Sequence, residues 1–191
     1  MPRFTRQQLD ACRGMEVPDL LGTDVRLLFV GINPGLWTAA TQTHFANPSN
    51  RFYPALLRAG IITRAVDPSA GMTDEDRDHL RSRGIGITNL VRRATARASE
   101  LTDDELRDGG RRLEALVADV RPRVVAVAGI TAYRTAFGAR RAVPGHQPAD
   151  LAGAELWVVP NPSGLNAHET IATLAEAYAE AARAAGLPTP T

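Results

Sequence analysis

The chain has 191 residues, a formal net charge of +1, 44% apolar residues and 23% charged residues. This length and composition suit one globular domain and exclude a largely disordered chain. The apolar runs are too short to cross a bilayer, and residues 1–10 lack the apolar core of a signal peptide. We therefore expect a cytoplasmic protein with no membrane partner.

Three residue types exclude further classes of protein. Cys12 is the only cysteine, which rules out an internal disulfide, and the four histidines lack the spacing of metal ligands. We expect neither a metal nor another cofactor. All 22 basic residues are arginine, because the chain contains no lysine. Mechanisms that use a lysine Schiff base or a P-loop lysine are excluded.

Short apolar runs alternate with helical patterns along the chain. Residues 1–20 predict a loosely attached arm with a short helix, and residues 187–191 a frayed tail. Between them we predict buried strands at 26–31, 85–89, 124–129 and 156–160, and helices at 50–59, 73–83, 102–120 and 166–185. The order predicts an α/β fold, a three-layer αβα sandwich with a short, mainly parallel sheet of four to five strands. Residues 1–191 would form this single domain.

Polar loops follow the predicted strands at the edge where α/β folds bind ligands. The chain reads Gly31-Ile-Asn-Pro-Gly35 after the first strand, Thr88-Asn89 at the end of the second and Asn161-Pro-Ser-Gly-Leu165 after the last. An asparagine offers one acceptor and two donors without charge, so it can read a polar ring edge or hold a water molecule. The same residues are also common turn formers, and the loops alone leave both interpretations open.

Three further features bear on a ligand, and two of them have two interpretations each. Phe45 lies in a polar loop, where it would either anchor the loop in the core or provide a stacking platform for a planar ligand. Ser49, Asn50 and Arg51 precede a helix, where their donors are suited to a phosphate. Leu165 is tucked inward or fills the gap that an extruded base leaves.

Acidic residues are unevenly distributed. Asp and Glu are absent from residues 31–66, 84–99, 120–149 and 156–168, although these stretches contain many arginines. The pattern indicates either random clustering or one surface that faces an anion.

Together and in order, three motifs resemble the mismatch-specific uracil-DNA glycosylases, bacterial relatives of thymine-DNA glycosylase. They are Gly31-Ile-Asn-Pro-Gly35, Phe45-Ala-x-Pro-x-Asn-Arg-Phe52 and Asn161-Pro-Ser-Gly-Leu165. The resemblance implies the fold of uracil-DNA glycosylases and a hydrolase that acts on N-glycosyl bonds in base excision repair. Such an enzyme flips uracil, and less readily thymine or other damaged pyrimidines, out of G mispairs in double-stranded DNA. Without a lysine amine to attack C1′, we expect it to be monofunctional and to leave an intact abasic site.

The resemblance also assigns roles to individual residues. Asn33 would position the attacking water, and Phe45 would stack on the flipped uracil. The backbone amides of Ile32 and Phe45 would contact uracil oxygens, and Asn161 would face the leaving base. Gly164 and Leu165 would form the wedge that enters the duplex.

The chain departs from the family pattern at several positions. Asn166-Ala167 stands where relatives often have Ser-Arg. The DNA contacts expected of residues Ser163 to Asn166 therefore lack a guanidinium group. Asn166 or His168 would have to replace it. Thr38 would crowd the pyrimidine C5 position, which predicts weaker activity on thymine. Asn89 is placed among the substrate-binding residues with its role open.

Alternative functions remain. The chain could be a uracil-DNA glycosylase without opposite-base preference or with a preference for single strands, a non-catalytic protein that binds mispairs or abasic DNA, or a small-nucleotide enzyme with the same pocket. We expect a monomer associated with the nucleoid.

Overall fold

A five-stranded sheet forms the centre of the computed structural model, which describes residues 4–189. The strands are β1 (Leu27–Gly31), β2 (Ile85–Asn89), β3 (Val124–Ala128), β4 (Gly145–His146) and β5 (Glu155–Val159), in the spatial order β2-β1-β3-β5-β4. All neighbours pair in parallel except β4 with β5. The four predicted strands are confirmed to within one residue, and β4 adds a short antiparallel edge.

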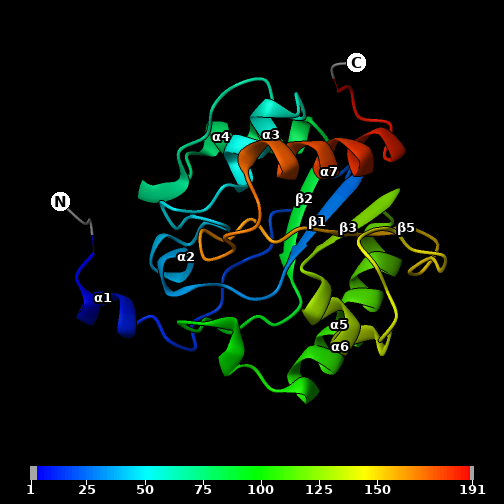
Figure 1. Cartoon of the computed structure of the whole chain (residues 1–191). Helices are drawn as coiled ribbons and strands as arrows, with labels where there is room; N and C mark the ends of the chain where they lie inside the picture. Colours follow the sequence, from blue (N-terminus) through cyan, green and yellow to red (C-terminus); the bar gives the residue numbers. More distant parts are fainter. Residues whose placement is uncertain (1–3, 190–191) are drawn as a thin grey trace.

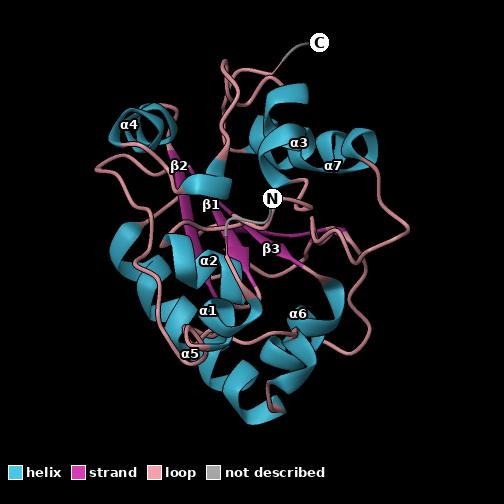
Figure 2. Ribbon diagram, turned by 90° about the vertical axis from the view of Figure 1, so that its left-hand side faces the viewer, coloured by secondary structure: helices cyan, strands magenta, loops and turns pink. Residues whose placement is uncertain are grey.

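Helices cover both faces of this sheet (Figures 1 and 2). The helices α3 (Phe52–Arg58), α4 (Asp74–Ser82) and α7 (Ile171–Ala184) cover one face, and α5 (Asp103–Val120) and α6 (Ile130–Phe137) cover the other. Along β1, Leu27 and Phe29 enter the first core while Leu28 and Val30 enter the second. Burial on both faces explains why the strand sequences are apolar without alternation. The three-layer α/β prediction is confirmed.

Two helices that begin after a threonine cap were predicted, and two that begin after a glycine were not. Thr73 and Thr102 cap α4 and α5 through capping boxes, at the residues where the two helices were predicted to begin. The helices α2 (Leu36–Thr41) and α6 follow Gly35 and Gly129, which have no side chain that could form a cap. Two 3₁₀ turns, η1 (Pro68–Ala70) and η2 (Ala98–Glu100), also lie outside the predictions.

The helix predicted for residues 166–185 begins only at Ile171, capped by Thr170, so that part of the prediction is wrong. The cause is a distant side chain. Arg51 donates hydrogen bonds to the backbone oxygens of Ser163, Asn166 and Glu169, which keeps this segment out of a helix.

Both chain ends pack more closely than predicted. A short helix, α1 (Arg6–Asp10), is present, but Val17 and Leu20 are buried, and Leu20 forms an antiparallel bridge with Ile87 of β2. Leu187 is also buried, so the predicted tail is wrong at that residue. Residues 1–3 and 190–191 lie outside the described residues.

The sheet topology creates a crevice. The chain leaves β1 toward β2 on one side, and it leaves β3 toward β4 and β5 on the other side. The loops at the carboxyl ends of β1 and β3 therefore diverge, which is where open α/β sheets bind ligands. No helix within residues 4–189 is long and apolar enough to span a membrane.

Candidate active site

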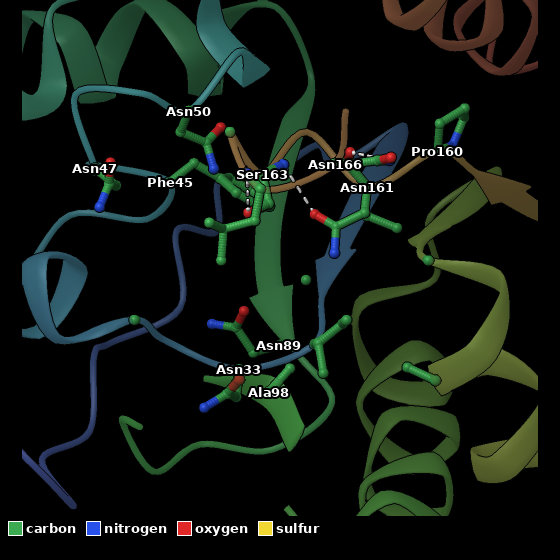
Figure 3. Close-up of a pocket in the computed structure, with 18 of the residues that line it drawn as sticks. Asn33, Phe45, Asn47, Asn50, Asn89, Ala98, Pro160, Asn161, Ser163 and Asn166 are labelled. Carbon is green, nitrogen blue, oxygen red and sulfur yellow. Dashed lines mark hydrogen bonds between the residues drawn. The ribbon is translucent and has the colours of Figure 1, made fainter. Parts of the chain in front are cut away.

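A cavity of about 790 Å³ opens at this crevice, between the loops that follow β1, β2, β3 and β5. Its volume lies within the range of small-molecule sites. In Figure 3, Asn33 and Asn89 lie on one side of the space, opposite Phe45, Asn161 and Ser163. The lining contains every predicted site residue except Arg51: Ile32, Asn33, Thr38, Phe45, Ser49, Asn50, Asn89, Asn161, Ser163, Gly164, Leu165 and Asn166.

Asn33 is held by its amide nitrogen. Nδ2 lies 2.8 Å from Thr95 Oγ1, 3.0 Å from the Arg93 carbonyl oxygen and 3.1 Å from the Pro34 carbonyl oxygen. Because all three partners accept hydrogen bonds, the orientation of the carboxamide is determined. Its Oδ1 has no donor among the described residues and can accept a hydrogen bond from water.

The segment that holds Asn33 is itself anchored. Thr95 is buried, and its hydroxyl donates to the Arg97 carbonyl at 2.8 Å. The Arg93 side chain pairs with Glu105, and this hydrogen bond is the main cause that lowers the pKa of Glu105 to about 2. Sequence reasoning missed Thr95, although it lies in an acid-free stretch just after β2, the same signal that singled out the other loops.

Phe45 forms a flat wall of the cavity. It stacks on Phe52 with ring centroids 4.1 Å apart and planes at 27°. Its φ of +55° is unusual for a bulky residue, which indicates that the surrounding packing holds it there. A Cβ at Gly31 would lie 3.3 Å from Phe45 Cζ and 2.4 Å from Asn89 Oδ1, so glycine leaves both groups their place.

Asn161 offers donors to the cavity. Its Oδ1 accepts the Ser163 N–H at 3.0 Å, which leaves Nδ2 without a partner among the described residues (Figure 3). The side chain of Asn166 donates to the Asn161 backbone oxygen at 3.1 Å and closes the loop. The backbone N–H groups of Ile32 and Phe45 likewise have no acceptor within residues 4–189. The site thus presents several uncommitted donors.

Leu165 stands at the tip of this loop with 86% of its surface exposed, which excludes the interpretation that it is tucked inward. Next to it, Gly164 lies against Ser49 so closely that a Cβ would be 2.4 Å from Ser49 Oγ. Arg51 donates to three backbone oxygens of the loop instead of facing solvent. Arg51 was predicted to bind phosphate, but in the structure its side chain instead shapes the loop.

The other predicted residues are placed as follows. Thr38 is buried, and its Oγ1 accepts the Ala46 N–H at 3.4 Å. Asn50 Oδ1 accepts the Phe52 N–H at the start of α3, while Asn89 Nδ2 lies 3.1 Å from His44 Nδ1. Among the described residues, no group of three or more His, Cys, Asp or Glu side chains could hold a metal ion.

Two comparisons with known proteins bear on this site. Residues 18–182 match the family model of the uracil DNA glycosylase superfamily. The fold is similar to the solution NMR structure of a protein from Methanosarcina acetivorans that is provisionally assigned as a uracil DNA glycosylase. That match has a TM-score of 0.57 and 20% sequence identity, and it covers 87% of this chain and 98% of the other. At this identity the structural likeness supports the fold alone.

Proposed function

The chain belongs to the uracil DNA glycosylase superfamily, and from that premise we propose that it is a monofunctional glycosylase for uracil in G·U mispairs of duplex DNA. The observation that carries the proposal is the convergence of Asn33, Phe45 and Asn161 on one cavity, with Leu165 exposed beside its mouth. These groups match the needs of a reaction on an extruded base.

The energy of base extrusion supports a preference for mispairs. Extrusion costs a few kcal/mol, and least for a mispaired base. Stacking on Phe45 returns ~1–3 kcal/mol, and burial of Leu165 in the vacated stack contributes ~1.5–3 kcal/mol. These gains suffice for a mispaired uracil more readily than for a sound pair.

The chemistry follows from the uncommitted polar atoms. Asn33 Oδ1 accepts a hydrogen bond from water and directs its oxygen toward C1′ of the sugar. As the glycosidic bond breaks, negative charge develops on uracil, and the N–H groups of Ile32 and Phe45 together with Asn161 Nδ2 stabilise it. An amide orients water without removing its proton, so turnover is expected to be slow.

Two finer features belong to this proposal. Because the chain has no lysine, we infer that no side-chain amine attacks C1′, and the product is an intact abasic site. Thr38 lines the cavity with a buried side chain, and we infer that it disfavours the C5 methyl group of thymine.

A panel of labelled oligonucleotides tests the proposal. Base release is measured from G·U, A·U and G·T duplexes and from single-stranded uracil, for the natural protein and for Asn33→Ala. We expect G·U to be cleaved fastest, G·T more slowly, and Asn33→Ala to lower G·U release by about 10²–10³-fold while binding survives. Equal release from all uracil substrates favours a glycosylase without opposite-base preference. Binding without release by the natural protein favours a mispair-binding protein.

A further inference from the structure

A buried histidine forms part of the cavity wall. His44 has 5% of its surface exposed and contacts two groups with its ring nitrogens. Nε2 lies 2.9 Å from the Pro18 carbonyl oxygen, and Nδ1 lies 3.1 Å from Asn89 Nδ2. The mechanism above uses neither contact.

The two contacts determine the tautomer. The Pro18 carbonyl can only accept, so Nε2 carries the hydrogen, and in a neutral imidazole Nδ1 is then an acceptor. Burial lowers the pKa of His44, opposed by the hydrogen bond to Pro18 and by Asp19 and assisted by Arg92. The neutral ring therefore predominates at pH 7, and only the NH₂ group of Asn89 can face it.

The Pro18 carbonyl is well fixed. The adjacent Asp19 accepts a hydrogen bond from Thr88 Oγ1 at 2.7 Å, and Leu20 pairs with Ile87 through both backbone groups. Both contacts tie this segment to β2, the strand that ends in Asn89. His44 is therefore held against the same strand whose last side chain it orients.

Asn89 is turned by this contact. With Nδ2 on His44, Oδ1 lies on the side of Gly31 and Phe45, 2.4 Å from where a Gly31 Cβ would be. Oδ1 has no donor among the described residues and borders the cavity. The wall beside the stacking ring thus presents an acceptor.

We propose that His44 is a positioning residue that fixes the Asn89 carboxamide so that the cavity accepts a ring N–H and rejects a ring lone pair. This rests on the proposed function, because the ligand is then a pyrimidine on Phe45. Uracil carries a hydrogen on N3, whereas cytosine has a lone pair there and is its natural competitor in DNA. His44 would thereby favour uracil through its hold on Asn89.

Two amide variants, each of which mimics one ring nitrogen, separate orientation from simple packing. His44→Asn places an acceptor near the position of Nδ1 and loses the Pro18 contact, whereas His44→Gln keeps a donor near Nε2 and loses the acceptor. We expect His44→Asn to remain close to the natural protein. His44→Gln should lose about tenfold in single-turnover release from G·U, the worth of one hydrogen bond. The ratio of inhibition by free uracil to inhibition by free cytosine should fall with it.

Thermal melting of both variants provides the control for folding. Equal uracil-to-cytosine ratios in both variants, or a loss confined to His44→Asn, would overturn the positioning role. If the natural protein releases no uracil from any substrate, the proposed function fails instead. An active natural protein with an unchanged His44→Gln contradicts only the role of His44.

The preference for uracil as a function of pH separates positioning from packing, because a packing role alone would not change it with pH. When His44 becomes protonated, Nδ1–H donates and turns Asn89 Oδ1 away from the cavity. The natural protein should keep its preference for uracil at pH 7 and lose it as the pH falls below 6.5 through the lowered pKa of His44. His44→Asn should show no such loss, and a parallel loss in that variant would contradict the proposal.

Discussion

The loop that follows β1 and the loop that follows β5 border one cavity but hold their side chains in different ways. In the first, Asn33 Nδ2 is shared among three acceptors, and only Oδ1 remains uncommitted. In the second, Leu165 projects into solvent with 86% of its surface exposed. The first loop fixes the place of a single atom, and the second presents an apolar surface that has no partner within residues 4–189.

The difference separates two tasks. A group that orients a reacting water needs a fixed geometry, because small displacements cost large factors in rate. A group that fills a vacated base stack needs only apolar volume at the correct place. We therefore expect changes in the β1 loop to lower the rate of bond cleavage, and changes in the β5 loop to lower the share of substrate with an extruded base.

Leu165→Ala should lower the release of uracil more than Thr95→Val does. Loss of most of the side chain removes much of the ~1.5–3 kcal/mol gained by burial in the duplex, so release from G·U should fall by about 10–100-fold. The melting temperature should not change, since the side chain contacts little of the protein. Leu57→Ala, at an exposed leucine of α3 that does not line the cavity, is the matched control. Equal losses in both variants would contradict a wedge role.

Thr95→Val tests the fixed geometry of the β1 loop. Valine fills a similar volume but removes one acceptor of Asn33 Nδ2 and the donor to the Arg97 carbonyl. We expect single-turnover release from G·U to fall by about tenfold, with binding of a G·U duplex unchanged. Thr95→Ser keeps the hydroxyl and should retain most activity. Weaker DNA binding with a normal rate of cleavage would reverse the division of tasks between the loops.

The sequence predicted local structure well and distant partnerships poorly. The strand β3 (Val124–Ala128) and the start of α5 at Thr102 depend on neighbouring residues, and both were predicted. The delayed start of α7 depends on Arg51, and the orientation of Asn89 depends on His44; both partners lie far away in the chain. No pattern of neighbouring residues predicts such contacts between distant residues.

The site followed the same rule. The cavity lining could be predicted because the motif asparagines sit at strand ends, and parallel strands bring their carboxyl ends to one edge. Arg51 was assigned to phosphate because an arginine before a helix is suited to one. The fold instead surrounds its guanidinium with backbone oxygens, which only the path of residues 163–169 reveals.

The smallest expected effect concerns the charge near the cavity. Arg140 and Arg141 precede β4, which runs antiparallel to β5, so they lie near the carboxyl edge, and Pro144 of the same loop lines the cavity. Both are exposed and form no ion pair within the described part of the chain. If the duplex crosses this edge, Arg140→Gln/Arg141→Gln should weaken binding a few-fold. Its log–log salt slope should fall by up to about 2, roughly 0.9 for each lost phosphate contact.

The fold supplies a matched control at the other end of the sheet. Arg121 and Arg123 are also exposed and also lack ion pairs among residues 4–189, but they precede β3 at its amino end. Arg121→Gln/Arg123→Gln changes the net charge by the same amount, so it should leave the salt slope unchanged. Equal salt slopes for the two double variants would mean that DNA binding depends on net charge alone. A difference confined to the first pair would extend the recognition surface from the β5 loop to the loop before β4.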